Sequence, residues 1–196
     1  MTNVSQILPP SLWESAVALQ AYLDSNQFKF CFIGGIAVQR WGEPRVTEDI
    51  DLTVLAEFGA ERSIIEPLLN RYQSRHPDPL SFATQARILL LSDALGNDID
   101  LSIGGLPFEH RVHARSSVWG VPTTGSIRTC GAEDLVTLKA FASRPQDWID
   151  VEKIIIRQND RLDRRLILEE LTVLADLKEE PEIVDYVNQL FAKHIS

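Results

Sequence analysis

The strongest constraint on the fold of this chain comes from residues 28–55, where two short apolar runs flank a diglycine and a polar loop. Residues 28–33 are mainly apolar and aromatic, and residues 50–55 form a second apolar run, so both predict buried strands. Gly34 and Gly35 end the first run, and residues 36–41 have the pattern of one or two helical turns. The stretch therefore predicts a strand, a tight turn into a short helix, and a second strand.

Two carboxylates stand at the start of the second predicted strand. Because strand side chains alternate between faces, Asp49 and Asp51 share one face while Ile50 points into the core. Two neighbouring carboxylates repel each other unless they share a proton or bind a divalent metal. The backbone N–H groups at the diglycine open a helix and suit a phosphate. Together these features indicate nucleotide chemistry.

The same residues carry a family resemblance. Gly34-Gly35, thirteen intervening residues and then Asp49-Ile50-Asp51-Leu52 resemble the signature of the nucleotidyltransferase superfamily that includes DNA polymerase beta. The wording of residues 34–52 is most similar to the small bacterial nucleotidyltransferases of the AbiEii/MNT toxin–antitoxin group, and aminoglycoside nucleotidyltransferases have a similar core. The resemblance covers about residues 28–155.

A third carboxylate is expected from a predicted hairpin of residues 87–91 and 98–103. Asp98 and Asp100 alternate with apolar residues, so both lie on one face of the second strand. The resemblance requires an Asp between apolar residues on a strand beside the first pair, and Asp100 matches this setting better. Asp98 adjoins the turn, where a solvated turn residue is the alternative interpretation.

The resemblance implies that Asp49, Asp51 and Asp100 bind two Mg²⁺ ions, with Mn²⁺ as an alternative metal. These ions would support transfer of a nucleoside monophosphate from an NTP to an acceptor hydroxyl, with release of pyrophosphate. Gly34 and Gly35 would hold the β- and γ-phosphates. Without the glycines and the third Asp, the first two carboxylates would simply cap a surface turn.

Three further residues are candidates for nucleotide binding. The resemblance places an Arg-x-Thr, here Arg45 and Thr47, close to the metal pair, where Arg45 would steer phosphate or support Asp49. A solvated loop arginine is the alternative. Lys139 lies on a predicted helix, 132–143, from which it would reach the triphosphate as a point charge. The alternative is a surface ion-pair network that joins Lys139 to Arg144, Asp147 and Asp150, whose roles stay open.

The whole pattern predicts an α/β (α+β) fold with a small mixed β-sheet core of the nucleotidyltransferase type, flanked by helices. Residues 1–130 are expected to form this core, and residues 131–196 a C-terminal helical subdomain packed on it. Helices are predicted at 11–26, 60–72, 106–113, 132–143, 145–158, 163–178 and 182–194, short strands at 116–121 and 126–129, and a loop at 74–82.

Composition narrows the function classes. A net charge of −9, from 19 basic and 28 acidic residues, argues against a protein that coats nucleic acid. The sequence has no P-loop, Gly-x-Gly-x-x-Gly or Gly-x-Ser-x-Gly motif. There is no signal-peptide pattern and no apolar run long enough to span a membrane, so the cytoplasm is the expected location.

The expected partners are an NTP and an acceptor, either a tRNA end or a partner protein in a toxin–antitoxin pair. An aminoglycoside-type small molecule is the rival acceptor. A non-catalytic, antitoxin-like binding module is the alternative from another class of function.

Overall fold

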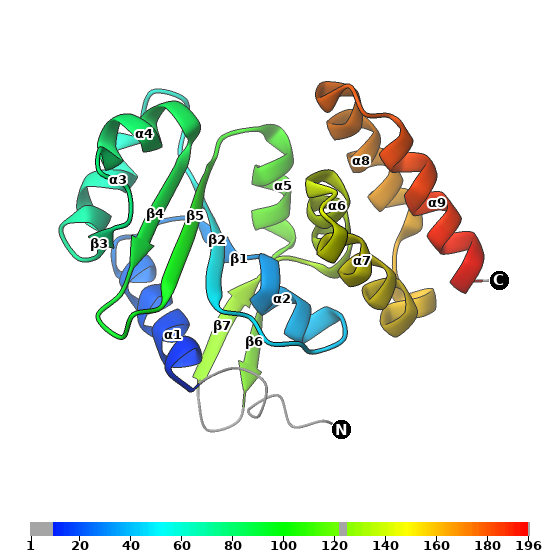
Figure 1. Ribbon diagram of the computed structural model, residues 1–196, viewed down its shortest axis with the longest axis horizontal. Helices are drawn as coiled ribbons and strands as arrows, with labels where there is room; N and C mark the ends of the chain where they lie inside the picture. The colour runs from blue at the N-terminus through cyan, green and yellow to red at the C-terminus, as the bar shows by residue number, and fades with distance from the viewer. Residues whose placement is uncertain (1–9, 122–124, 196) are drawn as a thin grey trace. The chain divides into compact units, whose positions relative to one another are not determined.

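The computed structural model describes residues 10–121 and 125–195 (Figure 1). The chain divides into two compact units. Of the described residues, the first unit comprises those up to Ile36 and those within Arg45–Cys130, and the second comprises Ala37–Pro44 and those from Gly131 onward. Each unit is described by itself below.

The first unit contains a mixed sheet of seven strands in the described residues, in the order β3-β4-β5-β2-β1-β7-β6. β2 runs parallel to β5 and antiparallel to β1, which is parallel to β7, while β4 and β5 form the predicted hairpin. The predicted mixed α/β fold is therefore confirmed. The strands are β1 (Phe30–Phe32), β2 (Asp49–Leu55), β3 (Gln73–Ser74), β4 (Ile88–Ser92), β5 (Asp98–Gly104), β6 (Ser117–Val121) and β7 (Gly125–Thr129).

Alternating burial along β2 and β5 separates a core face from a polar face. Ile50, Leu52, Ile99 and Leu101 are fully buried, whereas the aspartates between them are half-buried. Apolar residues of α1 (Pro10–Ser25) and α3 (Arg62–Leu69) join the same core cluster, among them Leu12, Leu19, Ile64, Ile65 and Leu68. Because one face of these strands is buried against this core, the aspartates lie on the other.

The remaining helices of the first unit are α4 (Pro79–Ala86) and α5 (Pro107–Arg115), and α2 (Gly34–Trp41) starts in this unit. The loop prediction for residues 74–82 is wrong from Pro79 onward. Asp78 caps α4 by accepting a hydrogen bond from the backbone N–H of Ser81 at 3.3 Å, and Pro79 occupies the first turn. A proline is well tolerated there because its missing N–H would have no partner in the helix. It starts a helix here rather than preventing one.

The second unit is helical, and its long helices are α6 (Ala132–Ala142), α7 (Pro145–Gln158), α8 (Arg164–Lys178) and α9 (Glu182–His194). α6 contacts each of the other three, and the buried residues include Leu135, Ile154, Ile155, Leu171, Val187 and Phe191. The segment 37–44 is tied to α7. The Gln158 side-chain amide donates to the Trp41 carbonyl at 2.5 Å, and Lys153 pairs with Glu43 at 2.7 Å.

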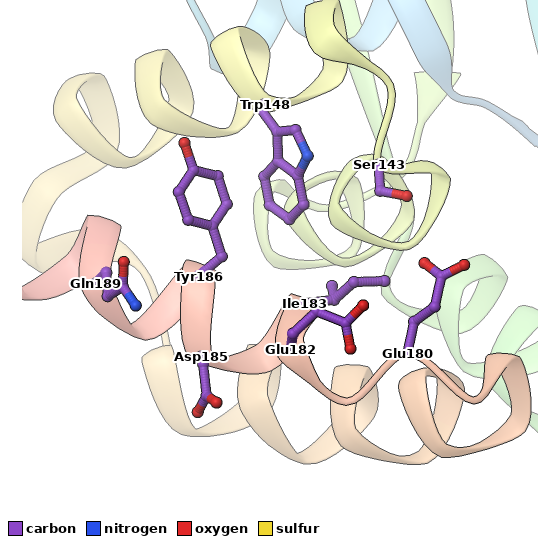
Figure 2. A pocket seen from close by; sticks show the side chains of 8 residues that line it. All are labelled: Ser143, Trp148, Glu180, Glu182, Ile183, Asp185, Tyr186 and Gln189. Carbon is purple, nitrogen blue, oxygen red and sulfur yellow. The ribbon is translucent and has the colours of Figure 1, made fainter.

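A pocket of about 560 Å³ opens within the second unit (Figure 2). Trp148 of α7 and Tyr186 of α9 meet edge to face there, with ring centroids 4.5 Å apart. The lining consists of these rings and Ser143, Glu180, Glu182, Ile183, Asp185 and Gln189. None of the residues predicted from the sequence to bind metal or nucleotide belongs to this lining.

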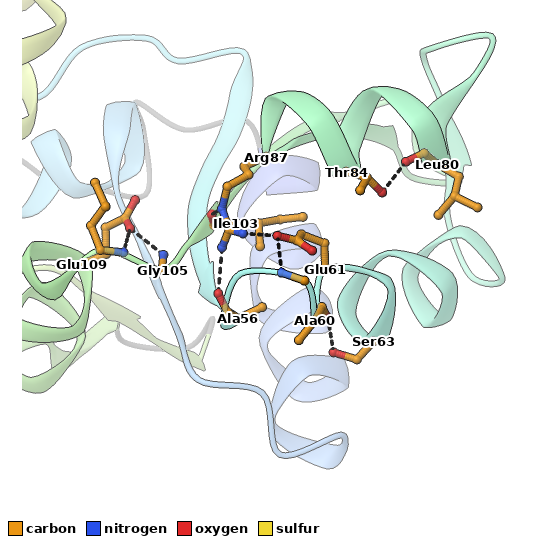
Figure 3. A network of polar contacts seen from close by, with 12 residues as sticks. Ala56, Ala60, Glu61, Ser63, Leu80, Thr84, Arg87, Ile103, Gly105 and Glu109 are labelled. Atoms are coloured by element: carbon orange, nitrogen blue, oxygen red, sulfur yellow. Dashed lines mark hydrogen bonds and ion pairs between the residues drawn. The ribbon is translucent and has the colours of Figure 1, made fainter.

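A polar network holds the end of β2 against β5 in the first unit (Figure 3). The Arg87 guanidinium donates to the carbonyls of Ala56, at 2.7 Å, and Ile103, at 2.8 Å. It also forms an ion pair with the buried Glu61 and stacks on the Phe58 ring, 4.3 Å from its centroid. One arginine therefore satisfies backbone carbonyls where the two parallel strands end.

We expect this network to make the stability of the protein depend on pH. The pKa of Glu61 is lowered first by hydrogen bonds from its own backbone N–H and that of Gly59, and further by Arg87, against the opposing effect of burial. Such a carboxylate contributes stability above its unfolded-state pKa and loses that contribution as the pH falls through its folded-state pKa. We expect the free energy of unfolding to decrease as the pH falls below 4.5, the ordinary pKa of a glutamate side chain. Glu61→Gln should remove part of that decrease in urea titrations at a series of pH values.

The matched control is Glu66→Gln in α3, the helix that begins directly after Glu61. Glu66 pairs with Arg62 at 3.3 Å, and both side chains are more than half exposed, so this substitution should change stability by less than about 0.5 kcal/mol. A Glu61→Gln variant with the full pH dependence of the unsubstituted protein would contradict the expectation.

Candidate active site

The structure brings three of the predicted site residues to one point of the polar face. β2 and β5 pair in parallel with Asp49 opposite Asp98 and Asp51 opposite Asp100. Carboxylate oxygens of Asp49, Asp51 and Asp100 all lie within 4.8 Å of one another, and the three residues are half-buried. Asp98 is not a member of this cluster. The geometry thus selects Asp100 from the two candidates that the sequence left open.

The donor set fits a hard divalent cation. Three carboxylates this close repel one another strongly, and a bound cation would relieve that repulsion. Oxygen ligands alone, without thiolate or imidazole, are the set that Mg²⁺ and Mn²⁺ prefer. The Asp49–Asp51–Asp100 cluster is therefore the candidate metal site of the first unit.

The diglycine lies directly against this cluster. Gly34 has a φ of +56°, and a Cβ atom there would lie 1.9 Å from Asp51 Oδ2. A Cβ atom at Gly35 would lie 2.2 Å from Thr47 Oγ1. The Gly35 N–H, in the first turn of α2, points at Asp51 Oδ2 at 3.4 Å. Packing thus requires glycine at position 34, against the Asp51 side chain, and at position 35, against the Thr47 side chain, besides any contact with phosphate.

The two predicted loop residues have different surroundings. Thr47 is buried, and its hydroxyl donates to Asp49 Oδ1 at 3.0 Å, which orients that carboxylate. Arg45 is half-buried, and its guanidinium donates to the Val46 carbonyl at 3.1 Å.

Sequence reasoning missed Arg75. Its guanidinium pairs with Asp98 Oδ2 at 3.2 Å and with Asp100 Oδ1, and its Nε donates to the Leu91 carbonyl at 2.9 Å. Arg75 directly follows the two-residue strand β3, which pairs with β4. No local pattern marks this arginine, because only the addition of β3 to the sheet brings it to β5.

Lys139 belongs to the second unit, where it joins α6 to α7. Its buried ammonium lies 2.7 Å from Asp147 Oδ1 and 2.9 Å from Asp150 Oδ2. Asp147 also accepts from the Arg144 backbone N–H at 3.3 Å, and Asp150 accepts from the Gln146 side-chain amide at 3.1 Å. Lys139, Asp147 and Asp150 thus form a buried ion-pair cluster, not the surface network of the alternative prediction, and the exposed Arg144 contributes its backbone N–H.

Gly34→Ala tests the packing of the diglycine. The added methyl group would displace the Asp51 carboxylate, and the positive φ would add strain of about 1–2 kcal/mol. We expect a lower free energy of unfolding and at least about a tenfold loss of Mn²⁺ affinity in calorimetric titrations. Gly59→Ala is the control, because Gly59 has a φ of +88° but nothing within 4 Å of an added Cβ. Equal Mn²⁺ affinity in both variants would contradict this view of Gly34.

The fold and the site together define a class of protein. A mixed sheet that presents carboxylates from two adjacent strands, against a glycine bend that opens a helix, is the arrangement expected of a nucleotidyltransferase. Residues 18–182 match the family described as nucleotidyl transferase AbiEii toxin, type IV toxin–antitoxin system. The chain belongs to this AbiEii nucleotidyltransferase family, which confirms the predicted resemblance.

Similar solved structures are distant in sequence. An antigenic nucleotidyltransferase-like protein from Paracoccidioides brasiliensis is 15% identical, with 91% of this chain and 93% of that chain covered and a TM-score of 0.52. The lincosamide antibiotic adenylyltransferase LnuA, bound to lincomycin, is 15% identical, covering 72% of this chain and 94% of that chain at a TM-score of 0.44. The antibiotic-resistance factor ANT(2'')-Ia is 17% identical, covering 96% of this chain and 99% of that chain at a TM-score of 0.46. Only the first similarity carries weight, and it concerns the fold.

No curated protein matches the chain at a significant level. Among the helices of residues 10–121 and 125–195, none is long and apolar enough to cross a membrane.

Proposed function

We propose that this protein transfers a nucleoside monophosphate from an NTP to an acceptor hydroxyl, with divalent metal bound by Asp49, Asp51 and Asp100. The observation that carries the proposal is the convergence of these carboxylates within 4.8 Å beside the Gly34–Gly35 bend. Membership of a nucleotidyltransferase family supports the reaction type. Such a complete acidic cluster also favours a catalyst over a non-catalytic binding module.

The reaction exchanges one phosphorus–oxygen bond for another. The acceptor oxygen bonds to the α-phosphorus, the bond from this phosphorus to the oxygen that bridges to the β-phosphate breaks, and pyrophosphate leaves while the hydroxyl proton is lost. When bound, two Mg²⁺ or Mn²⁺ ions would neutralise phosphate charge and lower the pKa of the acceptor hydroxyl.

The residues of the first unit serve the two reactants, the triphosphate on one side and the acceptor hydroxyl on the other. Asp49 and Asp51 would help to hold both ions and so serve both sides, with Thr47 fixing the orientation of Asp49. The start of α2 at Gly34 and Gly35 favours the negative charge of the β- and γ-phosphates. Asp100, on the neighbouring strand, serves the acceptor side.

The two basic candidates receive different roles. Arg45, in the loop before Thr47, steers phosphate toward the cluster. The Lys139 ammonium is already held by two buried carboxylates, which favours a part in joining α6 to α7 over direct contact with the triphosphate.

The acceptor is a tRNA end or a partner protein of a toxin–antitoxin system. The type IV toxin–antitoxin assignment of the family supports such a context. Both acceptors, like NTPs, are available in the cytoplasm, where we place the protein.

The test is label transfer from each of the four NTPs, labelled at the α-phosphate, with total tRNA or co-purifying protein as acceptor. We expect label on one acceptor, dependent on Mg²⁺ or Mn²⁺ and abolished by chelation. An aminoglycoside included as a third acceptor separates the small-molecule alternative. If no acceptor is labelled and no non-hydrolysable NTP binds in the presence of metal, the proposal is wrong and the binding-module interpretation gains.

A further inference from the structure

The polar face of β2 and β5 carries four aspartates rather than three. Asp49 lies opposite Asp98 in the strand register just as Asp51 lies opposite Asp100, and all four follow the alternation of the strands. Carboxylates directly opposite each other on adjacent strands repel, so these four negative charges require a positive charge nearby. Register alone would let either residue of β5 complete a metal site, yet Asp100 joins the cluster and Asp98 does not.

Arg75 contacts both of these aspartates, each through a different nitrogen of its guanidinium group. Its Nη1 lies 3.2 Å from Asp98 Oδ2, and its Nη2 contacts Asp100 Oδ1. The guanidinium is itself fixed, because Nε donates to the Leu91 carbonyl at 2.9 Å and the Arg75 backbone N–H donates to the Leu90 carbonyl at 3.0 Å. A rigid planar fork held in this way sets both the position and the direction of the carboxylates it binds.

We propose that Arg75 is the positioning residue of the site: it engages Asp98 and holds Asp100 by one oxygen, toward Asp49 and Asp51. This inference rests on the proposed function. The guanidinium also places one positive charge beside the cluster, which lowers its attraction for a free divalent cation. Arg75 thus orients the third carboxylate but weakens the binding of the metal ion.

Two substitutions separate charge from geometry. Arg75→Gln removes both, so Mn²⁺ should bind about three- to tenfold more tightly in calorimetric titrations, whereas kcat should fall at least about tenfold. Arg75→Lys keeps the charge but loses the planar fork, so Mn²⁺ affinity should stay within about twofold while kcat still falls. The KM for the NTP should change little in both, because Arg75 contacts the acceptor-side carboxylate.

The control for removal of an arginine is Arg62→Gln. Arg62 lies on α3 and pairs with Glu66 at 3.3 Å on the surface, so neither Mn²⁺ affinity nor kcat should change.

Should Arg75→Gln fail to fold, Asp98→Asn removes the second anchor of the fork without touching the cluster. Its kcat should fall about threefold at unchanged KM, and an unchanged kcat would overturn the proposal.

The result that overturns the proposal is Arg75→Gln with unchanged or weaker Mn²⁺ binding, or Arg75→Lys with the turnover of the unsubstituted protein. If the unsubstituted protein transfers no label to any acceptor, the proposed function fails instead. The Mn²⁺ titrations still decide then whether Arg75 limits the charge of the cluster, because they require no turnover.

Discussion

Asp51→Asn is expected to reduce nucleotidyl transfer by about a thousandfold or more while leaving the fold intact. Asp51 is the member of the metal cluster that also lies against the glycine bend, with its Oδ2 facing the Gly35 N–H at 3.4 Å. Asn has the same shape but lacks the negative charge that binds a divalent cation. Loss of several kcal/mol of transition-state stabilisation corresponds to this decrease in rate.

Initial rates with labelled NTP measure this effect, and Mn²⁺ titration should show the parallel loss of metal binding. In the presence of chelator, Asp51→Asn should be at least as resistant to heat as the unsubstituted protein, because it removes one of three mutually repelling carboxylates. Glu48→Gln is the control, since Glu48 is an exposed carboxylate in the adjacent loop and should have no effect. An Asp51→Asn variant that keeps more than about a tenth of the rate would contradict the assignment of the cluster.

Lys139→Met is expected to cost about 3–5 kcal/mol of the free energy of unfolding. The Lys139, Asp147 and Asp150 side chains are all at most 9% exposed, so Met would remove the ammonium that pairs with two buried carboxylates. Unfolding in urea measures the loss. Adding Asp150→Asn should recover a large part of it, because one of the two buried carboxylates that lost the Lys139 ammonium then carries no charge.

Lys193→Met provides the comparison for Lys139. Lys193 pairs with Glu152 at 2.8 Å but is 64% exposed, so its loss should cost less than about 1 kcal/mol. The experiment also tests the role predicted from the sequence, in which Lys139 reaches the triphosphate. Unchanged stability of Lys139→Met with a strongly raised KM for the NTP would support that role and contradict the structural one.

Much of the fold follows from local patterns, and the start of α4 is a local pattern that the predicted loop at residues 74–82 does not include. The hairpin of β4 and β5, and α7 and α9 with both their ends, correspond to the predicted segments because apolar periodicity and proline mark them. The start of α4 was missed although its signal is local. Asp78 followed by Pro79 is a capping residue before a first-turn proline, a pattern that predicts the start of a helix rather than a loop.

The sequence by itself determined the features that depend on neighbours along the chain. Asp49 and Asp51 share a face because they are two apart on one strand, and the diglycine follows that strand's partner. Only the tertiary structure decided which carboxylate completes the cluster, that Arg75 holds it, and that Lys139 pairs with Asp147 and Asp150. These contacts join separate elements, so they depend on strand order and helix packing, and no short stretch of sequence encodes either.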